Sequence, residues 1–453
     1  MLFSLTNPEV AIMMMGIFLF AVLLGFPIAF TLMAMGLGFG YYAYFDPTKM
    51  EHLFDNRIFQ LFVQNTYTVM DNNVLTAVPL FLFMGYLVER AGIVAKLFFA
   101  IRLASHKLPA SMAVAALITC ALFSTATGII GAVVTLMGLL AWPAMIKAGY
   151  DKKFASGIIC SGGCLGILIP PSIMLIVYSV IAQLSPLRLF AAAIFPGLML
   201  AGLYIGYAIF RAWMNPSIAP KPAAEEIPPT AVIMKEVLVS FLPLFSLIIL
   251  VLGTILAGIA TPAEAAAVGA FGSLVLSYFY KTLKWKNFKE SVFLTAKTTA
   301  MIMWLFIGSW TFASVFSYLG GHEVFEHFFK SLNLQPWQFL VITQLIIFLL
   351  GWPLEWTEIL IIFVPIFLPL VEFFGVNPYF FAMLIALNLQ TSFLTPPMAM
   401  SAYYLKGVQS KNVELMQIFG GIMPFLGIVI LAMVLMYLFP GIALWLPETL
   451  FAN

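Results

Sequence analysis

The sequence predicts an all-α polytopic membrane protein made of two inverted-topology repeats, each with a re-entrant hairpin and a broken helix. Composition is the first observation: hydrophobic residues make up 63% of the 453 residues and charged residues 9%, against about 45–50% and 25% in soluble domains. The second observation is a pattern that occurs twice, in residues 142–178 and 368–404. A broken apolar segment at corresponding positions of two halves is the best sequence indication of a secondary transporter's binding site.

The repeat is defined by residues that recur at one constant offset. Pro170-Pro171 in the first half corresponds to Pro396-Pro397 in the second, 226 residues later. The same offset relates Pro143 to Pro369, Gly149 to Gly375, Phe154 to Phe380 and Tyr178 to Tyr404. We therefore expect one structural plan to be used twice.

The first repeat, residues 1–213, divides into spans of about 20 apolar residues and segments that are interrupted. We expect a re-entrant hairpin at 109–146, interrupted at Ser124–Gly128, and a broken helix at 153–183, interrupted at Gly166–Ser172. The uninterrupted segments are spans at 8–26, 27–45, 72–89 and 188–213, with an amphipathic interfacial stretch at 91–106.

Residues 214–235 are polar and rich in proline, which predicts a linker on the cytoplasmic side. The second repeat, residues 236–453, then follows the same plan, with a re-entrant hairpin at 337–373 and a broken helix at 378–405. Its other segments are spans at 236–259, 262–280, 290–319 and 411–440, with an amphipathic stretch at 321–332.

Charge distribution favours the inverted arrangement. Two re-entrant hairpins leave five crossings per repeat, so the second repeat is inverted relative to the first. With the N-terminus outside, sixteen of the 21 Lys and Arg residues lie inside and four outside, with Lys297 in a span, in agreement with the positive-inside rule. If the hairpins were simple spans, Lys147, Lys152 and Lys153 would lie on the face opposite Lys107. We therefore expect both termini on the outer side.

The interruptions are candidate ion sites, because irregular backbone at membrane depth persists only where it is buried in protein or lines a cavity. Pro170 and Pro171 lack N–H groups and push the preceding residue away from helical dihedrals, which frees carbonyl oxygens for a cation. Ser124, Thr125 and Thr127 add hydroxyl oxygens at the first hairpin tip. Together these oxygens predict a cage for Na⁺, a hard ion.

In the second half the corresponding parts are Ser392, Thr395, Pro396 and Met398 at the break, and Gly351 to Glu358 at the hairpin tip. The alternative is that these Pro and Gly residues only kink helices while Ser and Thr bond back to carbonyls. The half-helices that begin near Ser172 and Met398 direct partial positive charge toward the midplane, which suits an anionic substrate.

Two carboxylates lie at the second predicted hairpin tip, Glu355 and Glu358. Charged residues inside spans are costly and mark functional sites, so these two bind a cation or gate the site, or else they face water at a cavity mouth. Glu264 follows Thr261-Pro262 and fits a helix start. No Walker A motif is present, and the three cysteines fit simple packing. We see no nucleophile–base pairing and expect no enzyme.

Several motifs resemble the large membrane subunit (DctM-like, M subunit) of tripartite ATP-independent periplasmic (TRAP) transporters. The most specific match is Leu165-Gly166-Ile167-Leu168-Ile169-Pro170-Pro171-Ser172, which is similar to the family's LGILIPPS. Further similar segments are Val78-Pro79-Leu80-Phe81 with Met84-Gly85, Pro143 to Lys147 with Gly149-Tyr150-Asp151, Thr261 to Gly269, and Thr395-Pro396-Pro397. Residues 46–76 form a longer loop than is usual in the family.

The resemblance implies an elevator-type, ion-transporter-like fold and Na⁺-coupled import of organic carboxylates across the bacterial inner membrane. It implies two partners, a small four-helix membrane subunit (DctQ-like) and a periplasmic substrate-binding protein. It also implies two Na⁺ sites, the first formed by Thr127, Gly166, Ile169 and Pro170 and the second by Gly351, Ser392, Thr395 and Met398. The candidates for substrate contact or gating are Ser124, Thr125, Ser172, Glu355 and Glu358. The main alternative is a stand-alone organic-anion carrier, coupled to Na⁺ or H⁺, that needs no binding protein.

Overall fold

The computed structural model describes residues 6–48, 50–220, 229–409 and 413–451, and within them every regular element is a helix. The α-helices of the first half are α1 (Asn7–Leu23), α2 (Ile28–Ala43), α3 (Arg57–Met70), α4 (Ala77–Arg90), α5 (Ile93–Ala104), α6 (Ser111–Thr127), α7 (Ile130–Lys147), α8 (Lys152–Cys164), α9 (Ile173–Ala182) and α10 (Pro186–Met214). Those of the second half are α11 (Thr230–Leu256), α12 (Pro262–Phe279), α13 (Trp285–Tyr318), α14 (Gly321–Ser331), α15 (Pro336–Leu350), α16 (Trp356–Phe373), α17 (Pro378–Ser392), α18 (Met400–Val408), α19 (Leu415–Leu438) and α20 (Gly441–Leu450). Short 3-10 helices lie at Leu53–Asp55, Leu165–Ile167 (η2) and Pro216–Ile218.

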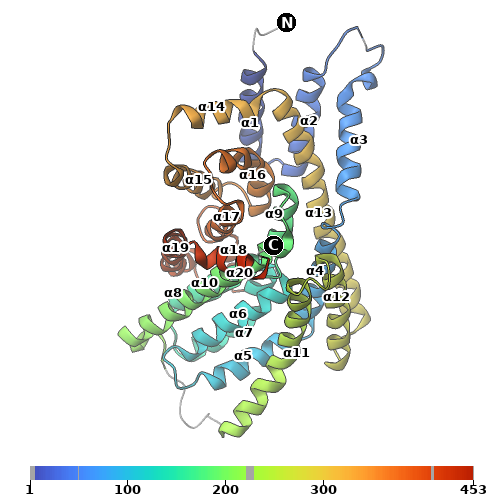
Figure 1. The fold of residues 1–453 in the computed structure, drawn as a ribbon. Coiled ribbons are helices and arrows are strands. Elements are labelled where there is room, and N and C mark those ends of the chain that lie inside the picture. Colours follow the sequence, from blue (N-terminus) through green and yellow to red (C-terminus); the bar gives the residue numbers. More distant parts are fainter. Residues whose placement is uncertain (1–5, 49, 221–228, 410–412, 452–453) are drawn as a thin grey trace.

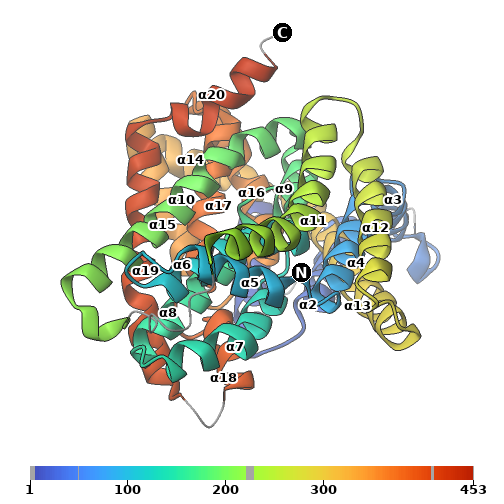
Figure 2. The same ribbon diagram turned by 90° about the horizontal axis from the view of Figure 1, so that it is seen from below.

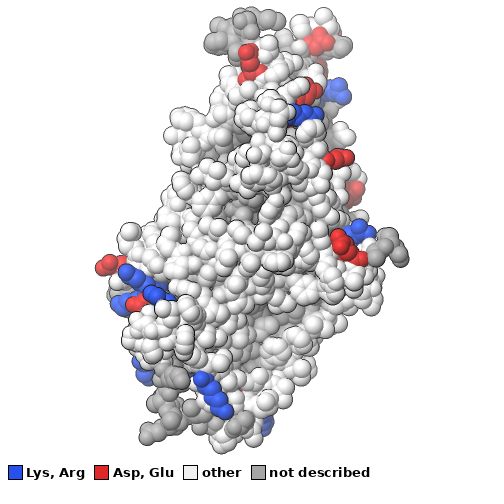
Figure 3. Space-filling model, turned by 60° about the vertical axis from the view of Figure 1, so that its left-hand side comes forward, with Lys and Arg blue, Asp and Glu red and all other residues white. Residues whose placement is uncertain are grey.

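Seven of these helices are long and apolar enough to cross a membrane, and the bent pair α4 and α5 raises the number to eight among the described residues. The two helices of that pair meet at 64°, where the sequence predicts a span followed by an interfacial stretch. On the face drawn in Figure 3, charged side chains gather toward the ends and edges, and the middle of that face shows almost none. The all-helical membrane fold predicted from composition is confirmed.

The order of elements in the first half recurs in the second. A hairpin of two helices (α6 and α7, then α15 and α16) is followed by an interrupted helix (α8 and α9, then α17 and α18) and by one long helix (α10, then α19). Figure 1 shows the first hairpin in the lower part of the molecule and the second in the upper part, with α9, α17 and α18 between them.

The two halves interlock through their broken helices. The second part of the first broken helix, α9, packs against α16 of the second hairpin, while α18 packs against α7 of the first hairpin. The first parts of the two broken helices also pack against the opposite half: α8 contacts α19, and α17 contacts α10. Seen from below, α8, α10, α17 and α19 form one group, and α2, α3, α4, α12 and α13 form another beside it (Figure 2). Each break therefore lies between parts of both halves.

Small residues allow the closest of these helix crossings. A Cβ atom added at Gly157 of α8 would lie 2.2 Å from the backbone oxygen of Gly421 on α19, and one added at Gly421 would lie 2.0 Å from the backbone oxygen of Lys153. Close backbone approach at small residues is the usual way in which membrane helices associate.

Three predictions about the elements need correction. Residues 46–76 are not simply a long loop, because they contain α3, an amphipathic helix that packs against α2 and α13. Helices α3 and α4 together cover Arg57 to Arg90, with an interruption between them. In the order of elements they correspond to the unbroken helix α13 of the second half. The last predicted span, 411–440, begins at Leu415, and a further helix, α20, follows it. The predicted linker 214–235 is too long, because residues 230–235 belong to α11, and its residues 221–228 lie outside the described residues.

Candidate functional site

The first hairpin turns later in the chain than the sequence predicts. Helix α6 continues through Thr127, and only Gly128, with φ +62°, and Ile129 leave the helical conformation. The hydroxyls of Ser124 and Thr125 are bonded within the helix, to Cys120 O and to Leu122 O (2.7 Å) respectively. The predicted interruption at Ser124–Gly128 is therefore wrong in its first four residues, because back-bonding lets Ser and Thr stay helical.

The first broken helix is interrupted where the sequence predicts. Helix α8 tightens into the 3-10 turn η2, and regular structure resumes only at Ile173. The Pro170-Pro171 peptide bond is cis, as is its counterpart Pro396-Pro397. Ser172 is fully buried and its Oγ donates to Ile167 O at 2.6 Å. The whole break from Leu165 to Ser172 is buried inside the protein.

The first hairpin tip and the first break are in direct contact. A Cβ atom added at Gly166 would lie 2.5 Å from Ser124 Cβ, and one added at Gly85 of α4 would lie 2.8 Å from Thr127 O. The Thr127 hydroxyl is 2% exposed and has no hydrogen-bond partner among the described residues. Ile169 packs instead on Gly197 of α10, where an added Cβ would lie 2.8 Å from Ile169 Cγ1. The structure thus joins the tip to the break and places an unused hydroxyl beside them.

The second hairpin tip and the second break make the corresponding contact. A Cβ atom added at Gly351 would lie 2.3 Å from Ser392 Oγ, which is buried and has no hydrogen-bond partner within the described part of the chain. Thr395 Oγ1 donates to Thr391 O at 2.8 Å, which leaves its oxygen lone pairs as acceptors. Met398 is half-buried, and Pro396 and Pro397 are exposed.

The contact between hairpin tip and helix break in each half, here called the tip-to-break contact, fits the chemistry of an alkali-metal site. Buried hydroxyls normally find partners, yet Thr127 Oγ1 at the first contact and Ser392 Oγ at the second have none in the described structure. Near Ser392, both amide atoms of Gln390 are also unpartnered, and sequence reasoning missed this residue. The sequence does show Gln390 as a polar side chain inside an apolar run, and polar residues inside membrane spans mark functional positions.

A cavity of about 320 Å³ lies between the two hairpin tips. It is lined by the first tip (Gly128 to Gly131), the second tip (Glu355 to Thr357), both broken helices and one face of α4 and α13. Its polar groups come from Tyr86, Thr298, Glu355, Thr357 and Tyr404. Of these, sequence reasoning singled out only Glu355 as a site candidate, although Tyr404 was a repeat position and Thr357 lay in the predicted tip. The tertiary structure alone brings the five together.

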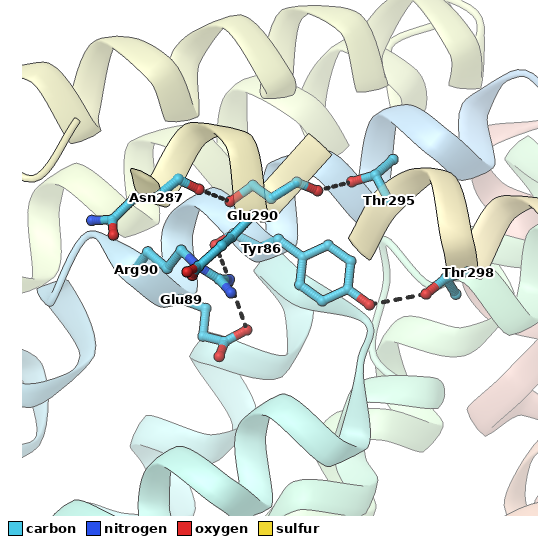
Figure 4. Close-up of polar contacts among 8 residues, drawn as sticks. Tyr86, Glu89, Arg90, Asn287, Glu290, Thr295 and Thr298 are labelled. Atoms are coloured by element: carbon cyan, nitrogen blue, oxygen red, sulfur yellow. Dashed lines mark hydrogen bonds and ion pairs between the residues drawn. The ribbon is translucent and has the colours of Figure 1, made fainter. Parts of the chain in front are cut away.

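The wall formed by α4 and α13 is fixed by polar contacts (Figure 4). The Tyr86 hydroxyl lies 3.1 Å from Thr298 Oγ1 at the cavity wall. One turn further along α4, Arg90 Nε lies 3.5 Å from Glu290 Oε2, and Arg90 Nη1 lies 3.9 Å from Glu89 Oε2. These contacts hold one wall of the cavity in place beside the two hairpins.

The other predicted charges are placed differently. Glu358 lies in the first turn of α16 and is 5% exposed, so it does not face water at a cavity mouth. Glu264 closes a capping box with Thr261 at the start of α12, as the sequence predicts. A second cavity, of about 400 Å³, lies between α15, α17 and α19, has almost purely apolar walls, and does not touch either hairpin tip.

Comparison with known proteins decides the family. The family described as "Tripartite ATP-independent periplasmic transporter, DctM component" matches residues 15–442. The chain belongs to this family. It is 28% identical to the C4-dicarboxylate TRAP transporter large permease protein DctM of Pseudomonas aeruginosa over 85% of this chain and 88% of that protein. It is 30% identical to the sialic acid TRAP transporter large permease protein SiaM of Vibrio cholerae over 84% and 87%.

A further relative of this TRAP large permease is the isethionate TRAP transporter permease protein DctMQ of Oleidesulfovibrio alaskensis, 28% identical over 84% of this chain and 59% of that protein. Among solved structures, the fold is similar to the YdaH transporter of Alcanivorax borkumensis, with a TM-score of 0.61, 15% identity and coverage of 92% and 98%. It is also similar to MtrF of Neisseria gonorrhoeae, with a TM-score of 0.54, 13% identity and coverage of 96% and 94%. These likenesses support the transporter fold.

Proposed function

We propose that this TRAP large permease is the transport subunit of a Na⁺-coupled importer for a small organic anion in the bacterial inner membrane. The observation that carries the proposal is the cavity between the two hairpin tips, with a tip-to-break contact in each half. Ligand sites in secondary transporters lie near the bilayer midplane, at the interface of two repeats and beside discontinuous helices. The lining of this cavity by both hairpins and both broken helices supports the proposal.

Two Na⁺ ions would be held at the two contacts. Thr127 with the carbonyl groups of Gly166, Ile169 and Pro170 would hold the first, and Gly351 with Ser392, Thr395 and Met398 would hold the second. The ions supply positive charge next to a cavity whose described lining contains no Lys or Arg. Thr127 and Ser392 offer the unpartnered oxygens, and the two tips bring those oxygens to the breaks.

Two observations support an anionic cargo: the helix N-termini beside the breaks and the names of the relatives. Helices α9 and α18 both begin directly after a break, and the N-terminus of a helix favours negative charge. Relatives of this chain are named for C4-dicarboxylate, sialic acid and isethionate, all of which are anions. C4-dicarboxylates and sialic acid are carboxylates and isethionate is a sulfonate, and we propose that the cargo of this chain is a small organic carboxylate.

The proposed assembly has three parts. The family description contains the word tripartite, and the name DctMQ of one relative joins two components. We propose that a small four-helix membrane subunit covers the outer helices and that a periplasmic binding protein delivers the cargo. The two halves would be inverted repeats with both termini periplasmic, and the hairpins with the broken helices would move as one elevator unit against the remaining helices.

Uptake into proteoliposomes tests this function. The chain is reconstituted with its small subunit, a binding protein loaded with a labelled C4-dicarboxylate or with sialic acid is added, and a Na⁺ gradient is imposed. We expect uptake to require both Na⁺ and the binding protein, and to fall at least about tenfold in Thr395→Ala at limiting Na⁺, if the lost oxygen ligand is worth about as much as a hydrogen bond to a charged group. Uptake that ignores the binding protein would favour a stand-alone carrier, and uptake without any Na⁺ dependence would refute the coupling.

A further inference from the structure

Glu358 is a carboxyl group in an unusual position. It lies in the first turn of α16, is 5% exposed, and its Oε2 atom has no hydrogen-bond partner among the described residues. Its chain neighbours Leu354, Ile359 and Leu360 are fully buried. An ionised carboxylate in such apolar surroundings is disfavoured, and a buried acid is retained only with a counter-charge, with hydrogen bonds or with a proton.

No counter-charge reaches Glu358 from the helices that pack against α16. Of these, α9 and α17 carry only Tyr178 and Tyr379 as titratable groups, and α15 carries none. Helix α14 carries the residues His322, Glu323, Glu326, His327 and Lys330, and lies at the other end of α16, where Lys330 Nζ is 4.6 Å from the Phe373 ring centre. Helix α13 meets α16 near Ser309, whose hydroxyl donates to Ile361 O at 3.0 Å. The charged residues of α13 are Lys286, Lys289, Glu290 and Lys297. Within the described residues, none of these groups forms an ion pair with Glu358.

A second carboxyl group connects Glu358 to the transport cavity. Glu355 lies one turn earlier, at the N-cap of α16, and lines the cavity together with Thr357 and Tyr404. Two carboxyl groups one turn apart oppose each other's ionisation. The pair therefore offers a short route from the cavity to a buried acid whose surroundings favour the neutral form over the ionised one.

We propose that Glu358 is a proton-binding site that loads and unloads during transport, so that the permease carries a proton as well as Na⁺ with its cargo. This rests on the proposed function. Glu358 Oε2 takes one proton from water in the cavity on one side of the membrane, which converts the carboxylate to a carboxylic acid. The same proton is returned to water on the other side. No other bond is made or broken.

A proton fits this position better than an alkali ion. Na⁺ requires several oxygen ligands, whereas the unpartnered side-chain oxygens in the first turn of α16 are two, Glu358 Oε2 and Thr357 Oγ1. An anionic cargo in the cavity repels ionised Glu358 and thus favours the neutral acid. By thermodynamic reciprocity, protonation of Glu358 strengthens binding of the anionic cargo to the same extent. Transport of the cargo and transport of the proton are thereby coupled.

The test measures proton entry alongside cargo uptake. Proteoliposomes with the complete transporter contain a pH-sensitive dye, and a labelled C4-dicarboxylate or sialic acid is supplied on the binding protein under a Na⁺ gradient. We expect the lumen to acidify in step with uptake, and we expect Glu358→Gln to lose the acidification and the pH dependence of uptake. Glu326→Gln is the control, because this half-buried glutamate of α14 pairs with Lys330 and does not line the cavity, and it should still acidify the lumen.

A second measurement does not depend on transport. In the purified wild-type protein, infrared difference spectra across a pH titration should show the carbonyl band of a protonated carboxyl group that Glu358→Gln lacks. Wild-type uptake without acidification, acidification that persists in Glu358→Gln, or a carboxyl band that never titrates would each overturn the proton site. A loss of all wild-type uptake would instead count against the proposed function, while the infrared titration would still decide the proton site.

Discussion

The two tip-to-break contacts use the same pair of residue types in exchanged places. In the first half the hairpin supplies Ser124 and the break supplies Gly166, whereas in the second half the hairpin supplies Gly351 and the break supplies Ser392. The surroundings differ as well, because the first break is buried throughout while Pro396 and Pro397 of the second are exposed. The repeat therefore preserves a close approach of backbone to a small polar residue, and leaves residue order and exposure free to differ.

The largest effect should come from filling the first contact. In Gly166→Ala the new Cβ would lie 2.5 Å from Ser124 Cβ and 3.3 Å from Ser124 Cα, atoms that cannot rotate away. We expect overpacking to cost about 1–3 kcal/mol in unfolding free energy and to abolish uptake. In Gly351→Ala the nearest atom is Ser392 Oγ, which a change of rotamer can move, so the loss should be smaller.

Thermal unfolding of the purified protein measures this difference. Gly407→Ala is the control, because nothing lies within 4 Å of a Cβ added there. Equal melting temperatures for Gly166→Ala and Gly407→Ala would contradict the close contact at the first break.

The next effect concerns the hydroxyls. Thr127→Val removes an oxygen that has no partner in the described protein and keeps the side-chain shape. If that oxygen binds Na⁺ and is worth as much as a hydrogen bond to a charged group, its loss costs about 1.5–3 kcal/mol, equivalent to a roughly 10–100-fold higher Na⁺ concentration for half-maximal uptake. The unfolding free energy without Na⁺ should not fall, because no protein hydrogen bond is lost.

Thr395→Val is the matched variant in the second half. Its hydroxyl donates to Thr391 O, so this change should also lower the unfolding free energy, by about 0.5–1.5 kcal/mol. An unchanged Na⁺ dependence in Thr127→Val would remove Thr127 from the ion site.

The smallest effect is on accessibility. Ser172 and Met398 occupy corresponding positions after the two Pro-Pro pairs, but Ser172 is fully buried and Met398 is half-buried. We expect a thiol-directed maleimide to label Met398→Cys at least about tenfold faster than Ser172→Cys, since thiol reactivity follows exposure. The native cysteines Cys120, Cys160 and Cys164 are buried and should give little background. Equal labelling rates would show that the two breaks are equally open in solution.

The sequence predicted the parts of the site that depend on local backbone chemistry. Proline removes an N–H group and restricts its neighbour, so the breaks at Gly166–Ser172 and around Pro396 are visible in the chain itself. The same reasoning failed at Ser124–Thr127, because serine and threonine remain helical when their hydroxyls bond back to carbonyls. It also missed α3 within residues 46–76, whose polar face hides the apolar signal of a packed helix.

By itself, the sequence determined the membrane class, the doubling of the plan and the two interruptions, since apolar length, repetition and proline are properties of the chain alone. The tertiary structure decided which residues meet. It placed Gly166 against Ser124, Gly351 against Ser392, and Tyr86 with Tyr404 at one cavity. It also buried Glu358, because the burial of a polar group depends on neighbours that are distant in the chain and are brought close only when the two halves interlock.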